Sequence, residues 1–240
     1  MLNILTRIRH KIKGYSSDEY IQTLRQKGAQ IGKGTFFFSP QETYMDNVKP
    51  WLITIGEYCK ITSRVTILAH DYSRSVARMY AHENIGGSAP VQIGNNVFIG
   101  MGVTILMGTK IGNNCIIGAD AVVKGNIPSN SVVAGNPSKV ICTLDEYIEK
   151  RKRKMIQEAV DCVRHSINLR GGGGPTIQEM GDGFAWLYLP RTLKTIEQFP
   201  EFFNLKGDNR ELVIHDFLNS NGVWESYDDF IKYALSENKN

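Results

Sequence analysis

A histidine and an aspartate stand side by side at the end of a short apolar stretch, in the segment ILAHDYSR at residues 67–74. An imidazole titrates at about pH 6.5, so at neutral pH it can take a proton from a weakly acidic group such as a hydroxyl. His70 is therefore a candidate proton-handling group, but an isolated histidine is also a common surface residue. The choice between these interpretations depends on the elements that position it.

A six-residue repeat surrounds this segment and predicts the fold. From Ile93 the chain reads IGNNVF, IGMGVT, ILMGTK, IGNNCI, IGADAV and VKGNIP. Each hexad begins with Ile or Val, and its fifth residue is small or β-branched. The fourth residues all tolerate a left-handed backbone conformation; they are Asn96, Gly102, Gly108, Asn114, Asp120 and Asn126. Strands this short must stack on copies of themselves, about 4.8 Å per layer, so we predict a parallel β-helix with three hexads per coil.

The repeat also occurs upstream, in a different phase. IGKGTF begins at Ile31, and IGEYCK, ITSRVT and ILAHDY follow from Ile55, after a separation that we interpret as four hexads. The hexad at Ile93 is out of phase with the hexad at Ile55, because the separation between them is not a multiple of six. We therefore expect a loop, from about residue 71 to residue 90, to leave the helix directly after His70.

The phase of the repeat also assigns positions to two reactive side chains. His70 is the fourth residue of its hexad, a corner position whose side chain points outward, and the inserted loop can build a pocket over it. Cys59 is a fifth residue, which points inward, so we expect it to fill the core rather than to carry an acyl group.

The segment VQIGNNVFIGMGVTILMGTKIGNNCIIGADAVVKGNIPSNSVVAGNPSKVI, residues 91–141, resembles the hexapeptide-repeat acyltransferases, in particular the maltose and galactoside O-acetyltransferases. PWLITIGEYCKITSRVTILAHDYS resembles the capsular-polysaccharide O-acetyltransferases. The resemblance covers about residues 20–142. It implies a mainly β fold, a left-handed β-helix, a homotrimer, and acyl-CoA bound in the cleft between subunits.

The resemblance also implies roles for individual residues. The catalytic histidine of the family matches His70, which would act as the general base. Asp46, in MDNVKPW, is a candidate for binding the acceptor hydroxyls or for orienting His70. Tyr80 and His82, in the inserted loop, are candidates for lining the pocket of a neighbouring subunit. The positions that match CoA contacts are Met101, which replaces a smaller residue, then Ala119, Lys124 and Gly125, and Lys139, which would face the phosphates.

The function that the resemblance implies is acetyl-CoA-dependent O-acetyl transfer to a sugar hydroxyl, of a surface or capsular polysaccharide or its precursor. We expect direct transfer in a ternary complex, because the CoA thiolate is a good leaving group and His70 supplies the base. Two alternatives stay open: N-acyl transfer to an amino sugar or antibiotic, and a non-enzymatic trimeric scaffold. A zinc carbonic anhydrase of this fold needs three histidines, and only His70 and His82 lie in the β-helical region, so no metal is expected.

Outside the repeat the sequence predicts helices. Residues 1–28 predict two short helices that cap the β-helix, the second starting at a capping box from Ser16 to Glu19; the basic first helix also permits contact with a membrane surface. A second capping box, Thr143 to Glu146, predicts a helix whose apolar face is Leu144, Tyr147, Ile148, Met155, Ala159 and Cys162. We thus expect a cap (1–28), a β-helix domain (29–142) and a mostly helical extension (143–240).

Composition excludes several classes of partner. The 240 residues have a formal net charge of +4 and no nucleic-acid-reading motif, so no nucleic-acid partner is expected. No apolar run approaches the ~20 residues of a membrane span, and the charged N-terminus lacks the features of a secretory signal. The four cysteines have no metal-type spacing, which indicates reduced thiols and a cytoplasmic protein.

Overall fold

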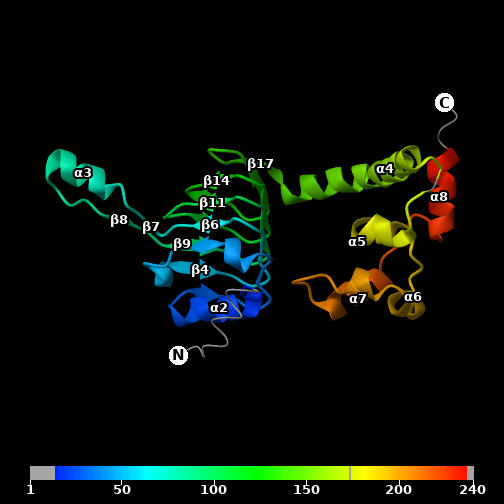
Figure 1. Ribbon diagram of the computed structural model, residues 1–240, viewed down its shortest axis with the longest axis horizontal. Coiled ribbons are helices and arrows are strands. Elements are labelled where there is room, and N and C mark those ends of the chain that lie inside the picture. The colour runs from blue at the N-terminus through cyan, green and yellow to red at the C-terminus, as the bar shows by residue number, and fades with distance from the viewer. Residues whose placement is uncertain (1–13, 173, 237–240) are drawn as a thin grey trace. The chain divides into compact units, whose positions relative to one another are not determined.

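The computed structural model describes residues 14–172 and 174–236 of the chain (Figure 1). Contacts between residues divide it into two compact units, residues 1–147 and residues 148–240. The expected domain boundaries after residues 28 and 142 stay a prediction.

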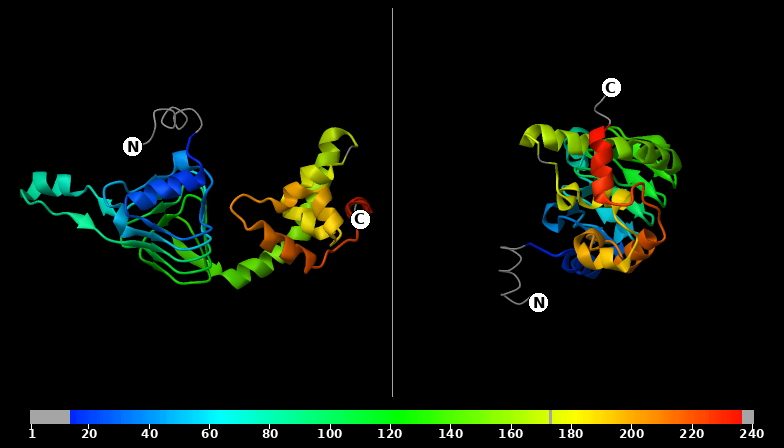
Figure 2. Two further views of the ribbon diagram at one scale, coloured as in Figure 1. Left: turned by 90° about the horizontal axis from the view of Figure 1, so that it is seen from below. Right: turned by 90° about the vertical axis from the view of Figure 1, so that its right-hand side faces the viewer.

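The first unit is built from stacked coils whose short strands form three sheets; apart from β17, these strands are parallel and two to four residues long. Sheet A contains β1 (Gln30–Ile31), β4 (Ile53–Ile55), β9 (Val91–Ile93), β12 (Lys110–Ile111) and β15 (Asn126–Ile127). Sheet B contains β2 (Phe36–Phe37), β5 (Lys60–Ile61), β10 (Val97–Ile99), β13 (Cys115–Ile117), β16 (Ser131–Ala134) and the antiparallel β17 (Lys139–Thr143). Sheet C contains β3 (Tyr44–Met45), β6 (Thr66–Ile67), β11 (Thr104–Ile105) and β14 (Val122–Val123). The coils outline a triangle with one sheet on each side (Figure 2), which confirms the predicted parallel β-helix.

The pairing of neighbouring strands gives the length of each coil. Gln92 pairs with Lys110, so a regular coil consists of three hexads. Ile55 pairs with Ile93, so the chain between these two residues also forms one coil, but it is more than twice as long as a regular coil. The excess, slightly longer than one regular coil, is an insertion. The predicted insertion after β6 is therefore confirmed in place and in length.

The first coil differs from the prediction. Ile31 pairs with Ile55, so this stretch is one coil that is longer than a regular coil by the length of one hexad, and its interpretation as four hexads is wrong. Two short 3-10 helices, η1 (Pro40–Glu42) and η2 (Pro50–Leu52), lie at its corners, and each begins with a proline. A corner insertion needs no inward aliphatic side chain in each hexad, which is why the hexads look degenerate here.

Left-handed backbone conformations occur at the turns between strands. Asn126 was expected to be one of them but lies in strand β15, and the preceding Gly125 has the positive φ, 84°. The reason is that Lys110 pairs with Asn126, two residues short of three full hexads, so this turn is shorter than the others. The other five fourth-position residues have positive φ as predicted: Asn96, Gly102, Gly108, Asn114 and Asp120.

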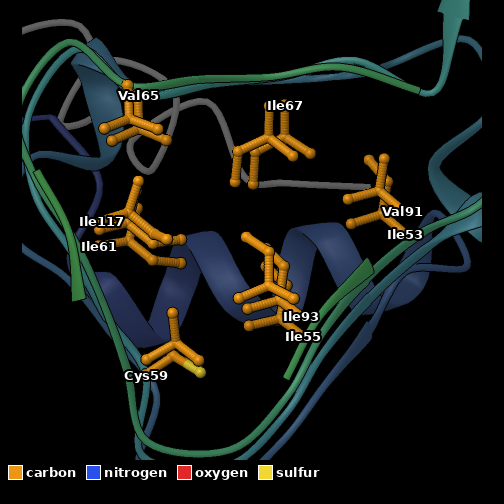
Figure 3. Close-up of a cluster of buried hydrophobic side chains, with 14 of the residues drawn as sticks. Ile53, Ile55, Cys59, Ile61, Val65, Ile67, Val91, Ile93 and Ile117 are labelled. Carbon is orange, nitrogen blue, oxygen red and sulfur yellow. The ribbon is translucent and has the colours of Figure 1, made fainter. Parts of the chain in front are cut away.

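The core of the first unit runs through the centre of the coils (Figure 3). First-position aliphatic residues stack in register, as Ile55, Ile93 and Ile111 do in sheet A, and burial of each contributes about 1.5–3 kcal/mol. Cys59 is fully buried in this core. The fifth-position residues also point inward and are buried: Val97, Val103, Thr109, Cys115, Ala121 and Ile127.

The inserted segment is a hairpin with a helix at its end rather than an irregular loop. Strand β7 (His70–Asp71) leaves the coil, helix α3 (Arg74–Ala81) follows, and strand β8 (Gly87–Ser88) returns antiparallel to β7. We call residues 70–88 the arm; it extends from one corner of the β-helix (Figure 2). His70 is therefore the first residue of a strand that leaves the coil, not a corner residue of the coil itself.

Helix α2 (Ser17–Gln26) packs on the first coil. Its capping box is confirmed, because the Glu19 N–H donates to Ser16 Oγ at 3.3 Å and the Ser16 N–H donates to the Glu19 carboxylate at 3.0 Å. Ile21 and Leu24 join the core of the β-helix. The first expected helix, and the membrane contact expected of it, lie outside the described residues.

The second unit is helical and has its own core. It contains most of α4 (Leu144–Arg170), then α5 (Ile177–Tyr188), α6 (Leu193–Gln198), the 3-10 helix η3 (Pro200–Phe203), α7 (Arg210–Leu218) and α8 (Tyr227–Ser236). Tyr188, Phe203, Phe217 and Phe230 are fully buried.

Helix α4 begins at its predicted capping box, because the Glu146 N–H donates to Thr143 Oγ1 at 3.2 Å. Its buried stripe contains Ala159 and Val163, whereas Ile148 and Cys162, both expected on the apolar face, are exposed. The assignment of Cys162 to the apolar face is therefore wrong, since it lies about 100° around the helix from Val163.

Candidate active site

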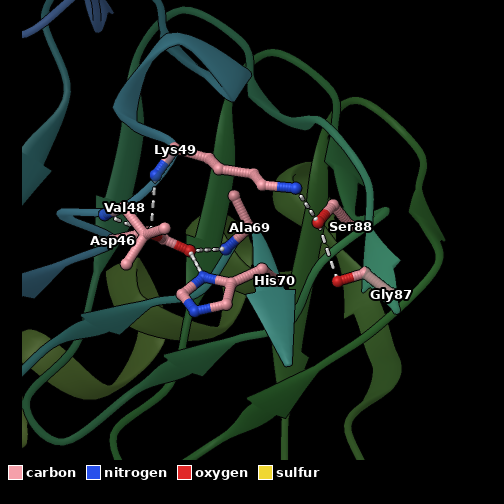
Figure 4. A network of polar contacts seen from close by, with 7 residues as sticks. All are labelled: Asp46, Val48, Lys49, Ala69, His70, Gly87 and Ser88. Carbon is pink, nitrogen blue, oxygen red and sulfur yellow. Dashed lines mark hydrogen bonds and ion pairs between the residues drawn. The ribbon is translucent and has the colours of Figure 1, made fainter. Parts of the chain in front are cut away.

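Two insertions occupy the same corner of the β-helix, where the chain passes from sheet C to sheet A; we call it the C–A corner. One insertion follows β3 and begins at Asp46, and the other follows β6 and begins near His70. Met45 of β3 pairs with Ile67 of β6, so the stacking of the coils places the two insertions in contact. Asp46 and His70 are therefore neighbours although they lie far apart in the chain (Figure 4).

Both carboxylate oxygens of Asp46 accept hydrogen bonds. Oδ1 accepts from the N–H groups of Val48 at 2.9 Å and Lys49 at 3.1 Å. Oδ2 accepts from the N–H of Ala69 at 2.8 Å and lies 2.5 Å from His70 Nδ1. Because the Asp46 side chain is fully buried, this position fits the orientation of His70 and does not fit contact with an acceptor hydroxyl.

The electrostatics of this pair leave the other imidazole nitrogen available. Burial raises the pKa of Asp46, but hydrogen bonds from His70 and from the N–H groups of Lys49, Ala69 and Val48 outweigh burial, so the pKa lies below its ordinary value. A charged carboxylate at Nδ1 keeps the proton on that nitrogen and makes Nε2 the acceptor. Within residues 14–172 and 174–236 nothing hydrogen-bonds Nε2, and the side chain is 22% exposed.

A cleft of about 470 Å³ opens beside His70, within the range of about 300–1,000 Å³ that is usual for small-molecule sites. Lys49 Nζ donates to Ser88 Oγ at 2.6 Å and so connects the first insertion to the returning strand of the arm (Figure 4). The cleft is lined by Val48, Lys49, His70, Asp71, Tyr72, Arg74, Gly86, Gly87 and Ser88. We call it the His70 cleft.

Most of these lining residues were not found from the sequence. Asp71, next to His70 in the chain, does not bond the imidazole; its Oδ1 accepts from the Ser73 N–H at 2.9 Å and from Ser73 Oγ at 2.6 Å. Lys49 lies three residues after Asp46, and this closeness in sequence is the one feature that indicates that Lys49 belongs to the site. Tyr72 and Arg74 belong to the arm, and no periodic pattern in the sequence predicts the hairpin that the arm forms.

Four of the residues expected at CoA lie at the two ends of the strands of sheet C. Met101 and Ala119 precede β11 and β14, at the turn from sheet B to sheet C. Lys124 and Gly125 follow β14, at the C–A corner. This turn lies two layers from the strand that leads to His70, or ~10 Å along the helix axis.

Lys139 lies beside the same sheet. It begins β17, directly after a turn that continues the stack of sheet C, because the Ser138 N–H donates to the Val122 carbonyl at 3.0 Å. Lys139 and Met101 are exposed. The five expected CoA positions thus surround the outer face of sheet C.

Tyr80 and His82 do not lie with His70. Tyr80 is on α3 and is 89% exposed, and His82 is the left-handed C-cap of that helix. Neither lines the His70 cleft of its own chain. Their expected place, in the pocket of a neighbouring subunit, stays a prediction.

Three further features bear on the chemistry of the site. Among the described residues, no group of three or more His, Cys, Asp or Glu side chains is arranged to hold a metal ion. The four cysteines are free thiols. Over the same residues, no helix combines the length and the apolar character that crossing a bilayer requires.

Comparison with known proteins gives consistent matches. Residues 90–125 match the family described as bacterial transferase hexapeptide (six repeats). The chain is 38% identical over 121 residues to the putative lipopolysaccharide biosynthesis O-acetyl transferase WbbJ of Escherichia coli, a match that covers 46% of this chain and 62% of WbbJ. It is 35% identical to the putative acetyltransferase YvoF of Bacillus subtilis, over 56% of this chain and 70% of YvoF. It is 37% identical to the protein CapG of Staphylococcus aureus, over 53% of this chain and 73% of CapG.

Proposed function

Because this chain belongs to the hexapeptide-repeat acetyltransferases, whose β-helix is left-handed, we propose that it transfers an acetyl group from acetyl-CoA to a sugar hydroxyl. One observation supports this reaction above all others: the imidazole of His70 is fixed through Nδ1 by a buried carboxylate, and His70 lines a cleft. The similarity to WbbJ, described as a putative O-acetyl transferase of lipopolysaccharide biosynthesis, supports a glycan as the acceptor.

His70 acts as the general base. Nε2 takes the proton of the acceptor hydroxyl as its oxygen attacks the thioester carbonyl, and the imidazolium is stabilised by the Asp46 carboxylate at 2.5 Å from Nδ1. The new C–O bond forms as the C–S bond breaks. The proton passes from Nε2 to the departing thiolate, which regenerates the neutral imidazole, so no acyl-enzyme is needed.

The acyl donor binds along the outer face of sheet C. Lys139 pairs with phosphate, because an exposed ammonium attracts phosphate oxygens. Lys124 and Gly125 contact the donor near its nucleotide end. Met101 and Ala119 contact the pantetheine arm through their main chains.

The active enzyme is a homotrimer whose sites lie between subunits. The expected CoA positions lie around the outer face of sheet C, where an adjacent subunit would complete the donor site. Tyr80 and His82 lie on the arm, away from the His70 cleft of their own subunit, where an adjacent subunit can receive them.

The decisive experiment measures CoA-thiol release from acetyl-CoA across a panel of mono-, oligo- and polysaccharides and of amino sugars. Wild type is compared with His70→Ala and with His215→Ala, which alters an exposed histidine of the helical unit. We expect hydroxyl-dependent release that falls roughly 100-fold or more in His70→Ala and is unchanged in His215→Ala. Release that survives His70→Ala removes the general base, and release with amines alone makes the protein an N-acetyltransferase.

A further inference from the structure

A second cleft lies further out on the arm than the His70 cleft. Its volume is about 420 Å³, and it is lined by Tyr72, Arg74, Ser75, Arg78 and Asn84. Tyr72 and Arg74 line both clefts, so the two are contiguous. A ligand longer than one sugar unit, with its reacting end at His70, therefore extends along α3 into the second cleft, which we call the arm cleft.

Two arginines give the arm cleft its charge. Arg74 and Arg78 are exposed and lie four residues apart on α3, so they share one face of the helix. The Arg74 guanidinium lies 5.1 Å from the centre of the Tyr72 ring, which holds it at the junction of the clefts. Within the described ranges neither arginine has a carboxylate partner, whereas Arg151 and Arg170 each bind a glutamate through two nitrogens.

The remaining charged side chains of the two clefts do not cancel this positive charge. Lys49 adds a third cation to the lining of the His70 cleft, with its Nζ at 2.6 Å from Ser88 Oγ. Asp71 is the one carboxylate in the lining, and Ser73 occupies its Oδ1. Guanidinium groups with free N–H donors recognise carboxylate and phosphate through paired hydrogen bonds.

We propose that Arg74 and Arg78 form a subsite for a negatively charged group of the acceptor, so that the acceptor is an acidic glycan. The anionic group is carried by the unit next to the sugar whose hydroxyl meets His70, and Tyr72 stacks on the sugar ring between them. This inference rests on the proposed acetyl transfer and specifies its substrate class. The shared chemistry is an anion on a saccharide, either the carboxylate of an acidic sugar or the phosphate of a sugar phosphate.

The first test compares acceptors that differ in charge alone. Matched oligosaccharides are offered in neutral form, with one uronic acid, and with one phosphate, at low and at high salt. We expect kcat/KM to be about tenfold or more higher for the charged acceptors at low salt, and the preference to shrink as salt screens the exposed arginines. The ranking of uronic acid against phosphate identifies the source of the anion.

Variants assign the preference to the arm. Arg74→Gln and Arg78→Gln should each raise KM for the charged acceptor about tenfold and so bring the ratio of charged to neutral kcat/KM close to one. Arg210→Gln, at an exposed arginine of α7 with no ion pair in the described ranges, makes the same charge change and should leave the preference intact. Equal use of neutral and charged acceptors, or a preference that survives both arm variants, overturns the proposal.

A binding measurement separates this inference from the proposed reaction. Calorimetric titration of the full chain with the uronic-acid oligosaccharide reports the subsite whether or not turnover occurs. Binding that Arg74→Gln weakens about tenfold, with no acceptor-dependent CoA release, supports the anion subsite and rejects acetyl transfer. No binding difference between the charged and neutral oligosaccharides rejects the subsite. If the mass of the assembly changes in the arm variants while the acceptor preference does not, the arginines belong to a subunit interface, and this result also rejects the anion subsite.

Discussion

Successive coils of the β-helix build the same corner in two different ways. In the upper coils, the turn from sheet C to sheet A takes four residues between β11 and β12 and two between β14 and β15. In the lower coils the same passage contains residues 46–52 after β3 and residues 68–90 after β6. Asp46 and His70 lie in the lower pair, at the bases of the two insertions.

The difference follows from how a stacked coil is held. In a regular turn, backbone groups bond the neighbouring layer, as when the Gly94 N–H donates to the Ile111 carbonyl at 2.9 Å. A residue in such a turn has almost no freedom in its position. An insertion is joined to the coils at its two ends. Its first residues are therefore positioned as accurately as the strands that they follow, and its other residues can line a cleft. The site therefore occurs where regular stacking gives way to an insertion.

The largest effect is expected from Gly94→Ala in a regular turn. A Cβ at this position would lie 2.7 Å from the backbone carbon of Gly112 and 2.5 Å from Asn113 Oδ1, so the layers would have to separate. Overpacking against backbone costs about 3 kcal/mol. Urea unfolding measures the loss of free energy of unfolding.

Gly86→Ala is the matched control in the arm, where nothing lies within 4 Å of the added Cβ. Its effect should stay within about 0.5 kcal/mol. Equal costs at Gly94 and Gly86 would contradict the idea that the regular turns are the constrained part of the molecule.

The next effect concerns the insertions and falls on catalysis. Asp46→Asn places an amide beside His70 Nδ1, removes the charge that stabilises the imidazolium, and permits the wrong tautomer. We expect kcat to fall roughly 100-fold, or ~2.7 kcal/mol, with KM for acetyl-CoA unchanged. Steady-state kinetics with the acceptor from the panel measure both constants. A rise in KM for acetyl-CoA without a loss of kcat would show that Asp46 acts on donor binding instead.

The regular part of the fold was predictable because one physical requirement recurs in every hexad. Ile93 and Ile111 must point inward and Asn96 and Asn114 must turn, so the pattern is visible in one sequence. The additional length of chain between Ile55 and Ile93 likewise fixed the place of the arm.

The insertions do not follow the six-residue repeat, so the sequence does not predict the structure within them. The hairpin of β7 with β8 and the hydrogen bond between Lys49 and Ser88 depend on segments far apart in the chain. The sequence leaves two roles open for Asp46, and its contact with His70 depends on the stacking of β3 on β6. The types of the residues alone do not show which two insertions are brought into contact by the stacking of the coils.

A smaller effect is expected at the end of the stack, where strand β17 contributes an exposed side chain to the donor site. Lys139→Ala removes one exposed cation at the end of the stack and should raise KM for acetyl-CoA about fivefold, or ~1 kcal/mol. Lys206→Ala, at an exposed lysine of the helical unit, is the control and should change nothing. An unchanged KM in Lys139→Ala would move the phosphate contact elsewhere.

The smallest effect is the share of Asp46 in the pH dependence of stability. Burial raises its pKa, but the hydrogen bonds from His70, Lys49, Ala69 and Val48 outweigh burial and lower the pKa in the folded state. A carboxyl group with a lowered folded-state pKa stabilises the fold above its unfolded value of about 3.9, and this stabilisation is lost as the pH falls through the folded value. The difference in free energy of unfolding between wild type and Asp46→Asn should therefore shrink as the pH falls below about 4. Other carboxylates with lowered pKa, such as Glu179, are present in both proteins and cancel in the difference. If the difference in free energy of unfolding stays constant at acid pH, the buried contacts do not lower the pKa of Asp46. The two insertions would then stabilise the charged carboxylate no better than solvent does.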